Sequence, residues 1–156
     1  MTKRENVWDY PRPPRLERVD VPLVAIFGGR EVARTQRGWR VLETSHPPTY
    51  YFHPEDVAEG VLEPAPGRSI CEWKGAAWYW SLVAGSRRAA GAAWSYPEPT
   101  PAFAPIKDHV AFYRNVLEAA FVGDMPVTPQ PGDFYGGWVT PNLDGPFKGG
   151  PGSWGW

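Results

Sequence analysis

The sequence has little cysteine, little excess charge and no long apolar run. Cys71 is the single cysteine, which excludes an intramolecular disulfide and a four-cysteine zinc site. The formal net charge is -1, so no excess of basic residues argues for a nucleic-acid partner. No stretch approaches the roughly 20 apolar residues of a membrane helix. Residues 1–10 also lack an apolar signal core, so we expect a cytoplasmic protein without a membrane partner.

Tryptophan, proline and glycine are abundant instead. The 156 residues include 9 Trp, 19 Pro and 17 Gly. Proline and glycine at this density shorten regular elements and multiply turns, which favours short strands over a helical bundle. Because 42% of the residues are hydrophobic and the length fits one ordinary domain, the composition predicts a single globular, mainly β domain.

The first part of the chain carries strand patterns separated by turn residues. Residues 23–27 form an apolar run, and Gly28-Gly29 after it tolerates positive φ and suits a tight hairpin turn. A return strand over 31–35 and a third strand over 39–44 follow. Pro54 opens an expected helical turn.

The centre of the chain, residues 71–84, is the most aromatic stretch. As one continuous strand it places Trp73 and Tyr79 on one face and Lys74 and Trp80 on the other. Further strands are expected over 87–96 and near 109–113.

Composition divides the chain into three segments. We expect an irregular, proline-rich N-terminal arm over 1–21, a β domain over 22–125 and a Pro-, Gly- and Trp-rich tail over 126–156. The aromatic residues of the tail are too apolar for a free linker, so we expect the tail to pack on the domain.

Several short motifs occur in a fixed order in the middle segment. They are ET at 43–44, YYF at 50–52, PEDV at 54–57, WKG at 73–75 after Cys71, YWS at 79–81, AWSYP at 93–97 and FY at 112–113. In these motifs the chain resembles the domain-of-unknown-function family 427, which is sometimes labelled nucleotidyltransferase-like. The resemblance implies a compact, strongly bent antiparallel sheet, β-tent-like or a small sandwich. To this the residues themselves add short helical turns and a long irregular C-terminal tail, which resembles an extension found in only part of the family. The resemblance implies no assigned activity.

The glycine-rich and histidine motifs of the sequence give little support for nucleotidyl transfer or for metal binding. Gly28-Gly29 is better explained as a hairpin turn, and the tail sequence GPFKGGPG does not match the phosphate-binding pattern Gx₄GK[ST]. The histidines, His46, His53 and His109, lie on separate segments without metal-ligand spacing. We therefore expect no metal and no cofactor.

The aromatic cluster is the strongest functional signal. Small sheets use tryptophan to fill a thin core, which explains about half of these residues, and the others are expected to line a pocket that stacks a flat or cationic small molecule. Lys74, Glu43 and Asp56 are the expected polar groups. The candidate ligand-binding residues are Glu43, Tyr51, Asp56, Lys74, Tyr79, Trp80, Trp94 and Tyr96.

Three alternatives remain open from the sequence. Lys74 can form a purely structural ion pair with Glu43 or Asp56. An enzyme can use the same pocket, with Lys74, Asp56 or Cys71 as the reacting group, although a lone cysteine is more often a small buried apolar residue. Finally, the aromatic tail can bind a partner protein or a second copy of the chain.

Overall fold

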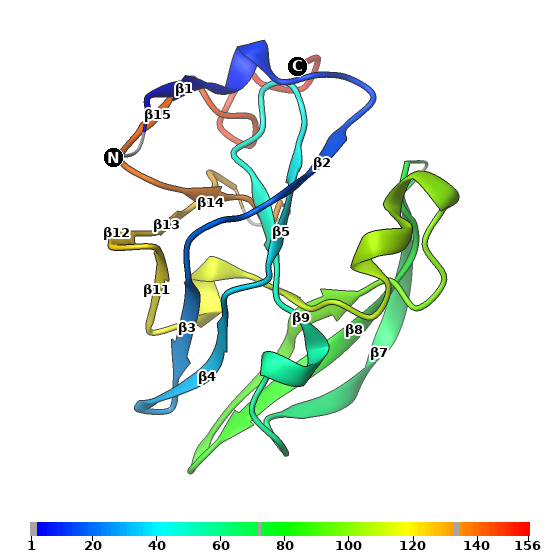
Figure 1. Cartoon of the computed structure of the whole chain (residues 1–156), viewed down its shortest axis with the longest axis vertical. Helices are drawn as coiled ribbons and strands as arrows, with labels where there is room; N and C mark the ends of the chain where they lie inside the picture. The colour runs from blue at the N-terminus through cyan, green and yellow to red at the C-terminus, as the bar shows by residue number, and fades with distance from the viewer. Residues whose placement is uncertain (1–2, 72, 133–134) are drawn as a thin grey trace.

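The computed structural model describes residues 3–71, 73–132 and 135–156, and it is mainly β with several antiparallel sheets. The mainly β class predicted from the sequence is therefore confirmed (Figure 1). No helix within the described ranges is long and apolar enough to cross a membrane. The short helices are η1 (Val7–Asp9), η2 (Pro54–Asp56), η3 (Pro101–Ile106) and η4 (Arg114–Val116). The strands are β1 (Glu5–Asn6), β2 (Arg15–Arg18), β3 (Leu23–Phe27), β4 (Arg30–Thr35), β5 (Trp39–Leu42), β6 (Thr49–Tyr51), β7 (Leu62–Cys71), β8 (Gly75–Ala84), β9 (Arg87–Ser95), β10 (Ala111–Phe112), β11 (Ala119–Val122), β12 (Met125–Pro126), β13 (Thr128–Pro129), β14 (Trp138–Val139) and β15 (Leu143–Asp144).

One four-stranded sheet has the order β12-β11-β3-β4 and contains the predicted N-terminal hairpin. Phe27 pairs with Arg30, so Gly28 and Gly29 form a two-residue turn, and their φ angles are 63° and 76°. Positive φ at both positions is the requirement of the type I′ turn, which suits glycine. The carboxylate of Glu118 accepts both turn amides, at 2.8 and 2.9 Å.

The second four-stranded sheet has the order β10-β9-β8-β7 and contains the longest strands. The sequence pattern predicts one strand over 71–84, but β7 ends at Cys71 and β8 begins at Gly75, with Trp73 and Lys74 in the turn between them. Gly75 has a φ of 110°, which other residues adopt with strain. The carbonyl groups of Trp73 and Lys74 accept hydrogen bonds from Thr100, at 2.5 and 3.0 Å.

A three-stranded sheet has the order β2-β5-β6, and its strand β2 is formed by N-terminal residues that pair with β5. Arg40 on β5 forms ion pairs with Glu5 at 3.1 Å and with Glu17 at 2.6 Å. β1 pairs in parallel with β15 of the tail. In Figure 1 the blue N-terminal residues and the orange and red tail therefore lie side by side.

The tail contributes a large residue to the main core. Trp138 is 1% exposed, and its ring lies 5.9 Å from that of Phe52 and 5.7 Å from that of Tyr50. Its indole N–H donates to the Phe112 carbonyl at 2.9 Å, and its backbone N–H donates to the Pro48 carbonyl at 2.8 Å. Both polar groups of this buried residue are thus satisfied, which a buried tryptophan requires.

We expect Trp138→Ala to lower the free energy of unfolding by about 3–5 kcal/mol, the range for removing a large buried aromatic side chain. Trp154→Ala is the matched control, because Trp154 is 90% exposed, and it should change stability by no more than about 0.5 kcal/mol. Urea unfolding followed by circular dichroism measures both values. Equal destabilisation by the two substitutions would contradict the core role of Trp138.

Candidate functional site

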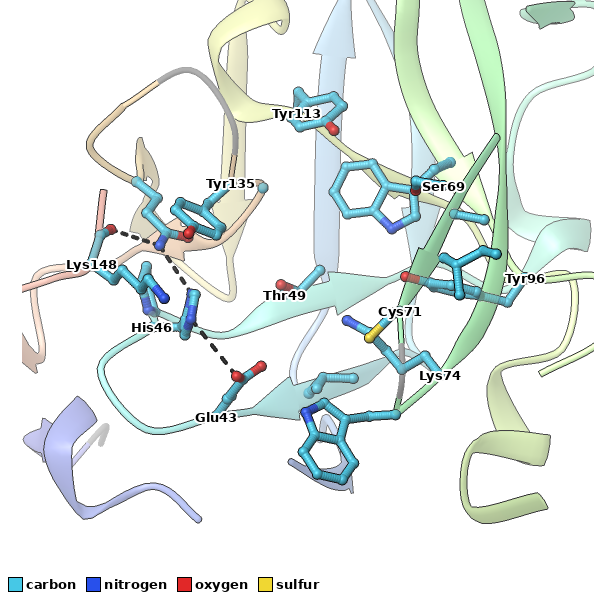
Figure 2. A pocket seen from close by; sticks show the side chains of 18 of the residues that line it. Glu43, His46, Thr49, Ser69, Cys71, Lys74, Tyr96, Tyr113, Tyr135 and Lys148 are labelled. Atoms are coloured by element: carbon cyan, nitrogen blue, oxygen red, sulfur yellow. Dashed lines mark hydrogen bonds and ion pairs between the residues drawn. The ribbon is translucent and has the colours of Figure 1, made fainter. Parts of the chain in front are cut away.

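A cavity of about 560 Å³ lies between the β2-β5-β6 sheet and the β7–β9 part of the long-stranded sheet, and the tail lines part of it. Its lining includes residues far apart in the sequence (Figure 2). The residues that line it are Val41, Glu43, His46, Pro47, Thr49, Ser69, Ile70, Cys71, Trp73, Lys74, Ala77, Tyr79, Trp94, Tyr96, Tyr113, Gln130, Tyr135, Gly136 and Lys148.

One side of the cavity is aromatic. The rings of Trp94 and Tyr113 pack at 4.6 Å, and the Tyr79 hydroxyl hydrogen-bonds the Ser69 hydroxyl at 2.7 Å. Burial raises the pKa of Tyr96. Burial and the nearby Tyr79 raise the pKa of Tyr113 to about 12. These phenols are therefore neutral near pH 7 and offer flat faces and hydroxyl groups, the features that orient a planar molecule in a pocket.

Lys74 lies beside this aromatic side, with its Nζ atom 5.7 Å from the centre of the Tyr96 ring. Among the described residues, no carboxylate lies within 4.0 Å of that ammonium group. The structural ion pair with Glu43 or Asp56 is therefore not formed. The turn between β7 and β8 also brings Cys71 and Lys74 to the same cavity, whereas a continuous strand would have separated them onto opposite faces.

The other side of the cavity is polar. Glu43 Oε2 lies 3.8 Å from His46 Nε2 and 3.6 Å from Arg12 Nε. His46 Nδ1 lies 3.2 Å from the side-chain nitrogen of Gln130, and its ring packs edge-on against Tyr135 at 5.1 Å. Burial and the nearby positive charges of Lys148, Arg12 and Lys74 lower the pKa of His46 to about 4. His46 is thus a neutral side chain near pH 7.

Five of the candidate ligand-binding residues predicted from the sequence line this cavity: Glu43, Lys74, Tyr79, Trp94 and Tyr96.

Tyr51, Trp80 and Asp56 lie elsewhere. Tyr51 is fully buried, and its ring lies 6.4 Å from that of Tyr96. Trp80 packs against the core that contains Trp138, and its indole N–H donates to Ser95 Oγ at 2.9 Å. Because neighbouring strand residues face opposite sides, Tyr79 and Trp80 cannot both line one cavity.

Asp56 lies in a different surface depression and has its own partners. Its carboxylate accepts a hydrogen bond from Arg37 at 3.0 Å and another from the Thr35 hydroxyl at 2.7 Å. The Arg37 hydrogen bond is the main cause of the lowered pKa of Asp56. Asp56 therefore forms a surface ion pair with Arg37 and does not line the cavity.

A family model described as a domain of unknown function, DUF427, matches residues 15–123 of the chain. The chain belongs to this family. A search of curated proteins finds no match to the chain. The matched region of the DUF427 domain includes Glu43, Lys74, Trp94 and Tyr96.

Four residues that line the cavity come from beyond the DUF427 match. They are Gln130, Tyr135, Gly136 and Lys148, all in the tail. Sequence reasoning missed them because no local pattern connects them with the β domain. One sequence feature pointed to Lys148, namely its place in the glycine-rich sequence GPFKGG. That sequence resembles a phosphate-binding motif only weakly.

The features that suggested phosphate or metal chemistry have other partners in this DUF427 structure. The Gly28 and Gly29 amides donate to Glu118, so a carboxylate of the chain itself occupies the place an anion would take. The His53 and His109 rings pack at 5.0 Å, apart from His46 in the cavity. Within the described part of the chain, no group of three or more His, Cys, Asp or Glu residues is arranged to hold a metal ion.

The lowered pKa of His46 predicts a pH-dependent stability. The unfolded chain binds a proton at His46 near pH 6.5, whereas the folded chain does so only near pH 4. The contribution of the neutral ring is therefore complete above pH 6.5 and is lost as the pH falls towards 4. Within this window, His46→Gln should reduce the slope of unfolding free energy against pH by up to ~1.4 kcal/mol per pH unit. Denaturant unfolding at several pH values measures the slopes, and parallel curves would contradict the assignment.

Proposed function

We propose that this DUF427 domain binds a small, planar organic molecule that carries an anionic group. The observation that supports the proposal is the position of Lys74, a cation at the edge of an aromatic cavity with no carboxylate partner among the described residues. The cavity volume of about 560 Å³ lies within the range of small-molecule pockets, about 300–1,000 Å³.

The aromatic side chains favour a flat ligand. Trp94 is 7% exposed and is held against Tyr113, while Tyr96 is 4% exposed and packs beneath Lys74. Side chains fixed in this way lose little conformational entropy when a ligand stacks on them. An aromatic or conjugated ring is thus the best match to this side of the cavity.

The polar groups favour an anion with a hydrogen-bond donor elsewhere. Lys74 is half-sheltered from solvent, so a carboxylate or phosphate oxygen that reaches it forms a charge-assisted hydrogen bond. Glu43, on the opposite side, accepts hydrogen bonds and suits an N–H or O–H group of the ligand. The positive charges that lower the pKa of His46 also attract an anionic ligand.

The proposal is tested with the full chain and two lysine variants. A native mass spectrum of gently purified protein should show a reproducible mass excess, and the same chain titrated with indole-3-carboxylate should show amide shifts at cavity residues in ¹H–¹⁵N spectra. Lys74→Gln should weaken the indole-3-carboxylate affinity about tenfold, the loss of one charge-assisted hydrogen bond.

Lys107→Gln is the control, because Lys107 is exposed and lies outside the cavity, and it should leave the affinity unchanged. Neutral indole should bind more weakly than its carboxylate in the unaltered chain. Equal affinities of the Lys74 and Lys107 variants, or equal binding of indole and its carboxylate, would contradict the proposal.

A further inference from the structure

Gln130 is the tail residue whose side-chain orientation is fixed by the backbone around it. It is 3% exposed; its Oε1 accepts the Gly137 N–H at 3.0 Å, and its Nε2 donates to the Lys148 carbonyl at 2.8 Å. A backbone N–H can only donate and a carbonyl can only accept. These two contacts therefore determine which atom of the amide is oxygen and which is nitrogen, without reference to His46.

The orientation of Gln130 determines the hydrogen-bonding state of His46. Gln130 Nε2 lies 3.2 Å from His46 Nδ1, and because that nitrogen is a donor, Nδ1 must be the acceptor. In a neutral imidazole the other nitrogen then carries the hydrogen. His46 Nε2–H is thus a donor, and the nearest carboxylate oxygen, Glu43 Oε2, is 3.8 Å from it, which is beyond normal hydrogen-bond distance.

Lys148 lies on the same side of the cavity as His46, and its ammonium group has N–H donors that remain available for a ligand. Its Nζ donates to the Trp156 carbonyl at 3.0 Å and lies 5.6 Å from the centre of the Tyr135 ring. An ammonium group has three donors, so this contact leaves two. Figure 2 shows Glu43, His46, Tyr135 and Lys148 on one side of the cavity and Cys71, Lys74 and Tyr96 on the other, with Thr49 between them.

We propose that Gln130 is a positioning residue that holds His46 as an Nε2–H donor, and that His46 and Lys148 form a second subsite for a carboxylate oxygen. This inference rests on the proposed function and extends it. Lys74 binds one anionic group of the ligand, and His46 with Lys148 binds another at the opposite side. The class of ligand is therefore a planar organic molecule with two carboxylates, in which any N–H or O–H group is placed to face Glu43. The tail supplies this subsite, since Gln130 and Lys148 lie beyond the region that matches the family.

The electrostatic surroundings keep His46 in the state that the subsite needs. Lys148, Arg12 and Lys74 all face it with positive charge, Glu43 faces it with a carboxylate, and Gln130 directs an N–H group at its Nδ1. A second proton on the ring would place two donors against each other at Nδ1. Burial and the three cations oppose that proton, so the ring stays a neutral donor at physiological pH.

The tautomer is tested by long-range ¹H–¹⁵N NMR of the histidine side chains in the full chain, with His46→Gln used to assign the signal. We expect the Nε2–H tautomer, neutral down to about pH 5. In Gln130→Glu the carboxylate accepts a hydrogen from Nδ1, so the tautomer should change and the pKa of His46 should rise by about 1–3 units. The Nδ1–H tautomer in the unaltered chain would overturn the positioning role, and this result does not depend on how the variant folds.

The subsite is tested by comparing terephthalate with benzoate, which lacks the second carboxylate. Lys148→Gln should weaken terephthalate binding about tenfold and change benzoate binding less than twofold, whereas Lys74→Gln should weaken both. Chemical-shift titration measures the affinities, and Lys107→Gln is again the control. If Lys74→Gln weakens both probes and Lys148→Gln weakens neither, the second subsite is wrong and the proposed function stands. If indole-3-carboxylate binds the unaltered chain and neither of these probes does, only the second subsite is overturned. If none of the three binds, both proposals are overturned.

Discussion

The burial of Trp138 in the main core is the interaction on which the candidate site depends. Its two polar hydrogen bonds and its contacts with Tyr50 and Phe52 hold the tail against the β domain. Gln130 and Lys148 lie on either side of Trp138 in the sequence, and both line the cavity. A surface segment of this composition would otherwise have little reason to adopt one conformation.

The cavity combines aromatic side chains with two lysine side chains. Each of its two lysines lies near an aromatic ring, Lys74 near Tyr96 and Lys148 near Tyr135. An ammonium group beside an aromatic face gains some electrostatic stabilisation yet keeps donors for a ligand. The arrangement therefore keeps positive charge available in a partly desolvated space, where electrostatic interactions are stronger than on the open surface.

The sequence was sufficient for the β3–β4 hairpin and for five of the residues that line the cavity. The β3–β4 hairpin was predictable because Gly28-Gly29 permits a turn with positive φ at both positions. The break between β7 and β8 was not, because it depends on Gly75 packing near Glu98 and on hydrogen bonds from Thr100, both distant in sequence. Asp56 was assigned to the site because its partner Arg37 could not be identified without the fold. The contact between His46 and Gln130 spans 84 residues and leaves no periodic signal.

The tail's two roles, in the core and in the cavity wall, create a thermodynamic linkage. A ligand held between the β domain and residues of the tail binds the closed state and not a state in which the tail has detached. Occupancy must therefore raise the free energy of local opening of the tail by RT ln(1 + [L]/Kd). Backbone amides around Trp138 would then exchange their hydrogens more slowly as the cavity fills. If the proposed ligand binds, hydrogen exchange of the amides around Trp138 would therefore report how far the cavity is occupied.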